Sequence, residues 1–249
     1  MKFTNLISYR YKSISMLLGL FGLTSVINSA LAQSDTLKND AFGTYIIMPI
    51  EFPVTDRTAL NEKLNASGLP DAIHPAANAG IGIQAYANRF FFTVAFNKGT
   101  REREEDTYLT EVEYRSTSFN VGYSLTKSHM FSVYPYAGLK MSGLNYLYRE
   151  KVPAEIPFED YLEQDLKYLE LNQSRAHLDL GLGISAQWFY LVNARAGYLV
   201  PFEKYKWTIN NADTDLTGSP GMKYKSYFSL TFGLGSLFTN DMERNHNRR

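Results

Sequence analysis

The sequence predicts an all-β fold, a closed eight-stranded antiparallel transmembrane β-barrel. Three observations predict it. The first two are eight segments in which apolar and polar residues alternate, and connections that are alternately short and long. A third is the composition of the polar face, which is made mostly of small uncharged residues. Together they indicate one large β-domain with an apolar outside and a polar inside.

Alternation with a period of two residues marks a strand whose two faces meet different environments. It is clearest in Ala176–Gln187, Tyr190–Val200 and Phe228–Phe238. Four earlier segments fit with more noise: Asn78–Tyr86, Phe90–Asn97, Thr117–Leu125 and Phe131–Met141. In the first segment, Phe42–Ile50, both faces carry apolar residues, so its phase stays open. An even number of strands is what a closed antiparallel barrel with both termini on one side requires.

The connections divide into two kinds. Those at 87–89, 126–130 and 187–189 are tight, whereas those near 51–77, 98–110, 142–175 and 201–224 are long. Short periplasmic turns opposite four long extracellular loops are typical of outer-membrane barrels.

The polar face separates this prediction from a soluble β-sandwich or a lipocalin-like barrel, which would also alternate. A soluble protein places many Lys, Glu and Asp side chains on its water-facing side. Here that face is mostly Gly, Ser, Thr, Asn and Gln, which suit a narrow lumen where a charged side chain needs a partner. The composition favours the membrane barrel.

The N-terminus predicts export. Lys2, Arg10 and Lys12 precede an apolar run at 14–27, and Ala30-Leu31-Ala32 resembles a signal-peptidase site, with cleavage expected after Ala32. The predicted organisation is a cleaved signal peptide (1–32), a periplasmic segment (33–40), the barrel (41–238) and a polar periplasmic tail (239–249).

Charge and cysteine content exclude several classes of function. Removing residues 1–32 takes three basic and no acidic residues from 25 of each, so 22 basic and 25 acidic residues remain and the net charge is about −3. Without a basic patch, nucleic acid is not an expected partner. The chain has no cysteine, which excludes disulfides, thiolate metal sites and a lipid-modified N-terminal cysteine.

On these segments the chain resembles the OmpA-like eight-stranded membrane barrels, and in particular the outer-membrane β-barrel domain proteins common in Bacteroidetes. The first loop, from Leu60 to Pro70, followed by the strand glycines Gly80 and Gly82, adds to the resemblance. The resemblance implies a bacterial outer-membrane protein and contact with the barrel-assembly machinery. Two departures are the polar tail after Phe238 and the lack of room for a peptidoglycan-binding domain.

Charges on the lumen face are the main candidate site, because an unpaired charge in a narrow interior is costly. Lys140, Asp179 and Arg195 fall on that face and predict an ion-pair network, with Asp179 opposite Gly197 and diagonal to Arg195. Glu111 and Glu113 could join it from the fourth strand, if that strand extends beyond the membrane. A structural plug is favoured over a gate or ion path, because an eight-stranded barrel is about filled by its own side chains.

His177 lies on the lumen face two residues before Asp179 and invites comparison with lipid A acyltransferases and deacylases. Such an enzyme needs a site open to lipid, and no nucleophile motif is present, so we expect a hydrogen-bonded structural histidine and no catalytic residue, metal or cofactor. His74 and His129 have no metal-ligand spacing.

Aromatic residues near the segment ends predict two interfacial girdles. Trp188, Phe189 and Tyr190 lie at a tight turn with Phe90–Phe92 at another, and Trp207 lies near the long loops. Further aromatics near those loops are Tyr146, Tyr148, Tyr205, Tyr224 and Tyr227.

The long loops carry three further features. The charge run Arg101–Asp106 predicts a solvated hairpin tip more than a Ca²⁺ site or a cation bridge to lipopolysaccharide. Leu60 and Leu64 predict a short amphipathic helix within Thr55–Ala66 that covers the barrel mouth. Glu159–Leu171 is either a second cap or an outward extension of the sixth strand.

We therefore expect an outer-membrane protein, not an enzyme, with a filled lumen and a structural or surface-interaction role. Its expected partners are outer-membrane lipid, lipopolysaccharide and an unknown extracellular ligand. The alternatives are a lipid-modifying enzyme that acts on lipid A acyl chains, and a narrow channel.

Overall fold

The computed structural model describes residues 41–75, 77–152, 167–203, 207–209, 215–216, 220 and 222–239. The predicted signal peptide, the segment 33–40 and the tail after Thr239 lie outside these residues, so they stay predictions.

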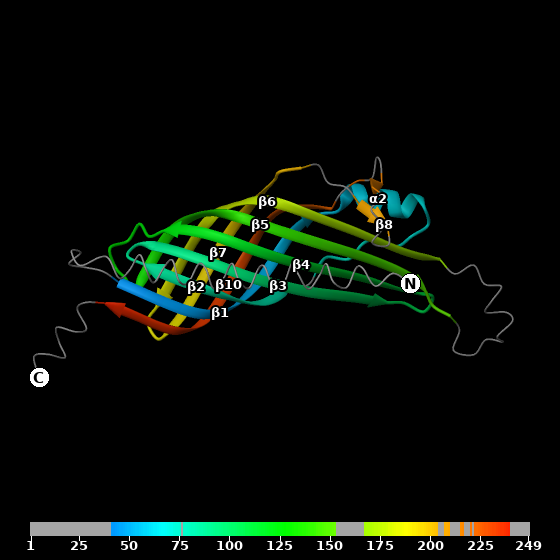
Figure 1. Cartoon of the computed structure of the whole chain (residues 1–249). Coiled ribbons are helices and arrows are strands. Elements are labelled where there is room, and N and C mark those ends of the chain that lie inside the picture. Colours follow the sequence, from blue (N-terminus) through cyan, green and yellow to red (C-terminus); the bar gives the residue numbers. More distant parts are fainter. Residues whose placement is uncertain are drawn as a thin grey trace, which may run out of the picture. The chain divides into compact units, whose positions relative to one another are not determined.

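Eight long strands form the barrel wall (Figure 1). They are β1 (Ala41–Asp56), β2 (Asn78–Ala87), β3 (Phe90–Glu104), β4 (Tyr108–Tyr123), β5 (Phe131–Glu150), β6 (Tyr168–Gln187), β7 (Tyr190–Pro201) and β10 (Lys223–Thr239). Each strand pairs antiparallel with its neighbours in the chain, and the pairing of β1 with β10 closes the wall. The predicted closed eight-stranded antiparallel barrel is confirmed.

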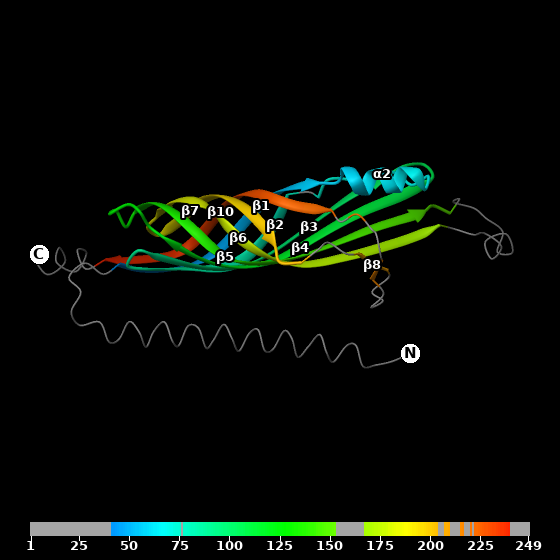
Figure 2. The same cartoon turned by 90° about the horizontal axis from the view of Figure 1, so that it is seen from above.

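Two short strands lie outside the wall. β8 (Trp207–Ile209) pairs with β6 at Leu171 and Asn172, and β9 (Asp215–Leu216) pairs with β8. They form a small hairpin on the edge of β6, in the connection between β7 and β10 (Figure 2).

Inward and outward positions alternate along every wall strand. In β1, whose phase the sequence left open, the odd positions from Ala41 to Glu51 face inward and are buried, while Ile46 and Met48 face outward and are exposed. Tyr45 and Ile47 are therefore lumen residues, and Glu51 joins them at the loop end. The apolar inner face of β1 packs in a lumen cluster with Phe91, Tyr134 and Leu191.

A glycine pair makes room for two tyrosines in the lumen. Gly181 and Gly197 are directly opposite in the β6–β7 ladder. A Cβ added to Gly197 would lie 2.3 Å from the Tyr227 ring, and one added to Gly181 would lie 2.5 Å from the Tyr136 hydroxyl. Only glycine allows both rings to lie against this part of the wall.

Four strands continue far beyond the others at the long-loop end (Figure 1). β2 has 10 residues and β7 has 12, about the length that crosses a bilayer, whereas β5 and β6 have 20 each. We call the projecting part the blade: residues 99–104 of β3, 108–114 of β4, 144–150 of β5 and 168–173 of β6.

The blade corrects two predicted loops. The predicted loop 98–110 is strand except for the turn 105–107, and much of the predicted loop 142–175 is the paired ends of β5 and β6. The sequence pattern hid these strand ends because the apolar side changes. Within the barrel the apolar side chains face outward, whereas in the blade Val112, Tyr114 and Tyr146 face inward and are buried.

Helix α2 (Thr58–Ala66) lies at this end of the barrel, in the connection between β1 and β2. Its Leu60 and Leu64 are buried in one cluster with Tyr114 and Tyr146 of the blade and with Trp207. The predicted helix is present, although Thr55 and Asp56 belong to β1. We call the helix, residues 67–75 and the β8–β9 hairpin the cap.

Candidate functional site

Arg195 of β7 is held at the centre of the lower lumen, by which we mean the half nearer the short turns; the upper lumen is the half nearer the long loops. Its Nη2 donates to Gln84 Oε1 and to Thr93 Oγ1, each at 2.7 Å, and its Nε donates to the Tyr134 hydroxyl at 3.1 Å. The Asn193 amide donates to the same Gln84 oxygen at 3.2 Å. Neutral oxygens from three other strands thus surround this buried guanidinium, which fixes the positions of the strands relative to each other.

Lys140 of β5 forms a buried ion pair with Glu51 of β1, across the lumen. Lys140 is 1% exposed and Glu51 is 3% exposed. The Lys140 ammonium also lies 3.8 Å from the centroid of the Tyr227 ring, and the Tyr114 hydroxyl donates to Glu51 at 3.5 Å. An ion pair shut from water in this way is costly to break, because losing either partner leaves an uncompensated charge.

Asp179 of β6 is joined to this ion pair through Tyr227. The Tyr227 hydroxyl donates to Asp179 Oδ2 at 2.7 Å, and the Asn120 amide donates to the same oxygen at 3.2 Å. The Tyr136 and Tyr227 hydroxyls are 3.0 Å apart. The upper lumen is therefore a layer of charges and tyrosines in direct contact.

His177 is completely buried beneath the blade, with its Nδ1 3.3 Å from the Lys140 carbonyl oxygen. The structure places it on the lumen side of the wall, next to the upper layer and away from the outer surface. In that position His177 can hold β6 against Lys140 of β5, and a lipid molecule outside the barrel cannot reach its ring.

The contacts of the lumen charges differ from the sequence prediction. Asp179 is opposite Leu199 instead of Gly197, so Arg195 is paired across from Gly183 and has the neutral partners described above. The predicted register was wrong by two residues. Pairing Asp179 with Gly197 requires a turn centred on Trp188, whereas the pairing of Gln187 with Leu191 centres the β6–β7 turn on Phe189.

Sequence reasoning missed Glu51. It assigned residue 51 to the first loop, whereas β1 continues to Asp56. The alternation of β1 runs unbroken from Tyr45 through Ile47 and Pro49 to Glu51, and that continuity was the signal that could have found it.

Glu111 and Glu113 lie on the outer face of the blade and do not join the lumen network, which corrects that prediction. Glu113 binds Lys98 at 2.9 Å and also Arg115, and these two cations lower the pKa of its carboxyl, although burial raises it. Glu111 is paired across from Glu102. Burial and then repulsion from Glu102 and Glu113 raise the pKa of Glu111.

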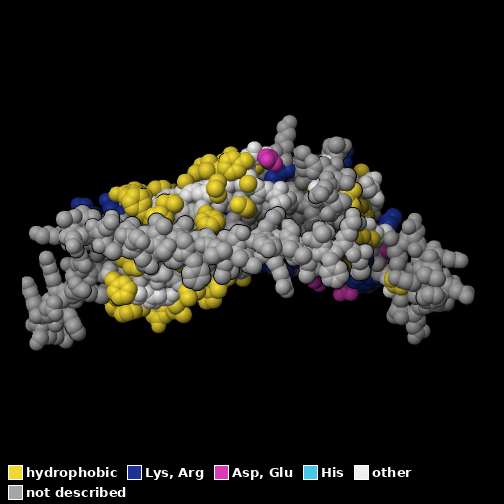
Figure 3. Space-filling view, viewed as in Figure 1, with side chains coloured by type: hydrophobic (Ala, Val, Ile, Leu, Met, Phe, Trp, Pro, Cys, Tyr) yellow, Lys and Arg dark blue, Asp and Glu magenta, His cyan; other side chains and the backbone are white. Residues whose placement is uncertain are grey.

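The outside of the barrel is apolar below the blade. Large hydrophobic side chains are exposed on all eight wall strands: Ile46, Met48, Ile81, Phe90, Phe119, Val121, Leu139, Met141, Leu182, Ile184, Val192, Phe232, Leu234 and Phe238. On the face that Figure 3 shows, hydrophobic side chains gather over the wall at the short-turn end, while acidic side chains lie toward the blade. Water does not tolerate such a continuous belt on a monomeric soluble protein, whereas a bilayer requires it.

The aromatic residues divide differently from the predicted two girdles. Trp188, Phe189 and Tyr190 are exposed on the outside at a short turn, with Trp188 49% exposed. Trp207 is 0% exposed and its indole Nε1 donates to the Pro220 carbonyl at 2.8 Å, so its assignment to a girdle was wrong. Four of the tyrosines near the long loops are also buried inside the protein: Tyr146, Tyr148, Tyr224 and Tyr227. Tyr205 lies outside the described residues.

The charge run Arg101–Asp106 is exposed at the tip of the β3–β4 hairpin. From Tyr168 onward, the segment Glu159–Leu171 is the outward extension of β6; its earlier part falls outside the described residues. Across the part of the chain that the structure describes, no group of three or more His, Cys, Asp or Glu side chains could hold a metal ion.

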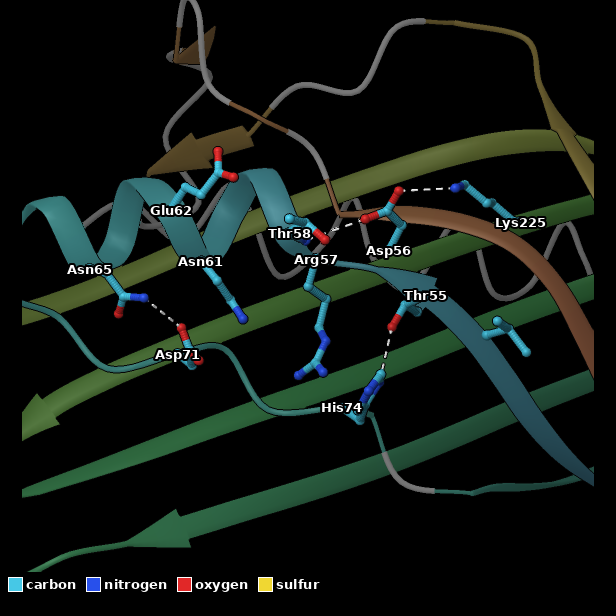
Figure 4. A pocket seen from close by; sticks show the side chains of 11 residues that line it. Thr55, Asp56, Arg57, Thr58, Asn61, Glu62, Asn65, Asp71, His74 and Lys225 are labelled. Carbon is cyan, nitrogen blue, oxygen red and sulfur yellow. Dashed lines mark hydrogen bonds and ion pairs between the residues drawn. The ribbon is translucent and has the colours of Figure 1, made fainter.

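An open pocket of about 580 Å³ lies between the cap and the end of β1 (Figure 4). Most of the side chains that line it are polar, and they include both positively and negatively charged groups. Lys225 binds Asp56 at 3.0 Å, and this hydrogen bond is the main cause that lowers the pKa of Asp56. Asn65 donates to Asp71 at 3.0 Å, and His74 Nδ1 lies 3.4 Å from the Thr55 hydroxyl oxygen.

No helix among the described residues has the length and hydropathy to cross a membrane. The eight wall strands are suited to lie in a membrane, because their hydrogen-bonded ring is closed and leaves no strand edge exposed within the apolar belt. Their polar side chains face inward. These features define the class, which is that of integral β-barrel proteins of the outer-membrane type.

Solved structures of this class are similar to the chain. They include the N-terminal β-barrel domain of OprF from Pseudomonas aeruginosa (11% identity, 78% of this chain and 96% of that chain, TM-score 0.41) and the Ail protein of Yersinia pestis (10%, 82% and 100%, 0.38). A major outer membrane protein from Thermus thermophilus is similar at 10% identity over 80% of this chain and 99% of that chain (TM-score 0.46). These likenesses are loose, so the class rests on the chain's own wall and belt.

No family model matches the sequence. No curated protein matches it either.

Proposed function

We propose that the protein is an integral barrel of the bacterial outer membrane with a filled lumen, and that it acts through the blade and cap at its long-loop end. The observation that carries this proposal is the contrast between the two ends. The short-turn end has tight turns and an exposed aromatic patch, whereas the other end carries an ordered structure above the belt with its own buried cluster.

The ordered blade and cap support a surface-interaction role. The blade extends four strands well beyond the length that closing the barrel requires, and its inner face is covered by the cap. Its outer face is polar, with Glu102, Glu111, Glu113 and Arg149 among the outward residues. A rigid polar platform held outside a membrane is suited to binding lipopolysaccharide or an extracellular ligand.

The lumen supports a scaffold more than a channel. Glu51, Lys140, Asp179 and Arg195 are all less than a tenth exposed and contact side chains of opposite strands. Tyrosine rings fill the space between these two charged layers. Ions would have to displace both layers in order to pass.

The proposal also includes that the protein is not an enzyme. Lipid A chemistry needs a site open to lipid, and His177, the residue that invited this hypothesis, is completely buried and faces inward.

Membrane placement and lumen state are tested together on the full chain. Expressed in a Gram-negative host, it should fractionate with the outer membrane and migrate faster in detergent gels before heating than after. In planar bilayers it should give no discrete conductance. Recovery in the soluble periplasmic fraction would overturn the placement, and stable conductance steps that change in Lys140→Ala would overturn the filled lumen.

The surface role is tested by a variant that keeps the wall. Replacing the outward-facing blade residues Glu102, Glu111 and Arg149 with serine should leave heat-modifiable migration unchanged and remove binding of lipopolysaccharide or whole cells to the purified protein. Unchanged binding would show that the blade does not carry the interaction.

A further inference from the structure

Four basic side chains converge where the cap meets the blade. β3 pairs with β2 only as far as Lys98 but with β4 as far as Glu104, so Gly99–Glu104 is the free edge of the blade. Arg101 and Arg103 lie on the inner face of this edge, because they pair across from Val112 and Thr110, which are buried under the cap. Arg57 binds Ala72, and His74 follows Ile73; because Ala72 and Ile73 are buried in one cluster with Val112, both side chains approach this edge from the cap side.

The cap holds Arg57 and His74 in fixed positions. Arg57 stands at the start of α2 and donates through Nη1 to the Ala72 carbonyl oxygen. The Ala72 amide in turn donates to Asn61 Oδ1 at 3.1 Å, so the loop is fastened to the helix. Figure 4 shows the Arg57 and His74 side chains together on the strand side of the helix, with Glu62 pointing the other way.

The cluster has more positive than negative charge. No ion pair or hydrogen bond joins the Arg101 or Arg103 side chain to another residue of the described chain, and Asp56 is already paired with Lys225. Asp71 is the carboxylate that acts on Arg57, and it accepts from Asn65. Burial first, and then repulsion from Arg101 and Arg103, lower the pKa of Arg57, against the effect of Asp71.

The same field acts on the histidine. Burial lowers the pKa of His74, and the charges of Arg57 and Arg101 lower it further. Mutual repulsion among cations held in place by a folded cap is relieved when an anion binds between them. Guanidinium groups are particularly suited to this, because their planar donors match the oxygens of a phosphate group.

We propose that Arg57, Arg101 and Arg103 form an anion site at the cap edge that takes a phosphate group. The group is carried by a phosphorylated lipid or sugar of the cell surface or by a free phosphate ester, since both present a phosphate monoester whose terminal oxygens share up to two negative charges. This inference rests on the proposed role of the blade and cap in surface interaction.

The test uses the full mature chain folded in a neutral detergent, with inorganic pyrophosphate as the probe, measured by titration calorimetry. Arg101→Gln with Arg103→Gln should weaken binding at least about tenfold, because each replacement removes charge-assisted hydrogen bonds, and Arg57→Gln should do the same. Lys127→Gln removes an exposed cation from the short turn between β4 and β5, at the opposite end of the barrel, and is the matched control that should bind like the original protein.

Absence of pyrophosphate binding, or equal weakening in Lys127→Gln, overturns the site. Vesicles of neutral phosphatidylcholine with and without lipopolysaccharide separate the two sources: competition by the lipopolysaccharide vesicles alone supports a lipid-linked phosphate, and competition by neither supports a free ester. Because pyrophosphate binding in detergent does not depend on where the barrel resides, it fails separately from the proposed outer-membrane function.

Discussion

Replacing Lys140 with Met breaks the ion pair in the lumen while keeping almost the same side-chain length. Glu51 is 3% exposed and would keep one long hydrogen bond, from the Tyr114 hydroxyl at 3.5 Å. Removing one partner of a buried pair costs about 3–5 kcal/mol, because the remaining charge is left without compensation. We expect the free energy of unfolding of the barrel to fall by about 4 kcal/mol.

The assay is urea unfolding of the barrel in lipid vesicles, followed by tryptophan fluorescence. With a slope of about 2 kcal/mol per molar urea, a loss of about 4 kcal/mol lowers the midpoint by about 2 M. Replacing both partners, Lys140→Met with Glu51→Leu, removes the stranded charge and should recover most of that loss.

The control is Lys225→Met, which breaks an exposed ion pair with Asp56 and should change stability by less than about 1 kcal/mol. The reasoning is refuted if Lys140→Met behaves like this surface control. It is also refuted if the double replacement is as unstable as the sum of the two single ones.

Three further predictions follow from the lumen, the aromatic residues and the blade. Gly197→Ala should lower the free energy of unfolding by about 1–3 kcal/mol, because the new Cβ would lie 2.3 Å from a tyrosine ring. Gly143→Ala is the control and should be tolerated, because the nearest atom to its Cβ would be 4.0 Å away. Equal urea midpoints for the two variants would contradict this. The chain has two tryptophans, so single Trp→Phe variants report on one each: brominated lipid should quench Trp188 and spare Trp207, and quenching of Trp207 would contradict its burial. Folding raises the pKa of Glu111, so the stability that this carboxyl contributes is fully present below its ordinary pKa of 4.5 and is lost as the pH rises through the raised value. Glu111→Gln should therefore make the blade more resistant to proteolysis at pH 7.5 and leave its resistance unchanged at pH 4. A larger effect at pH 4 would contradict this reasoning.

The wall of the barrel was predictable because one physical constraint acts along its whole length. Lipid outside and a polar interior impose apolar and polar alternation on segments such as Ala176–Gln187, and the structure places each of the eight predicted segments in the wall. The phase of β1 was not predictable, because Tyr45 and Ile47 fill the lumen with apolar atoms where other strands use polar ones.

The blade and the lumen contacts were less predictable. Where the wall leaves the bilayer, water lies outside and the cap lies inside, so the apolar side chains change faces, and Tyr146 was assigned to a loop. The partner of Lys140 lies 89 residues earlier in the chain, and local spacing carries no information about which strands face each other across a lumen. The register of Asp179 depends on a turn geometry that alternation does not determine.

The central claim is that lipid surrounds the wall and that its own side chains fill the lumen. Because the chain has no cysteine, single cysteines carrying a nitroxide spin label can be placed at Leu182 and Leu234 on the outside and at Ser185 and Thr231 on the inside. In vesicles, the outer labels should collide with oxygen and be shielded from a water-soluble nickel reagent, while the inner labels should be shielded from both. Nickel access at the inner positions would show an open pore, and nickel access at the outer positions would show that the wall lies in water.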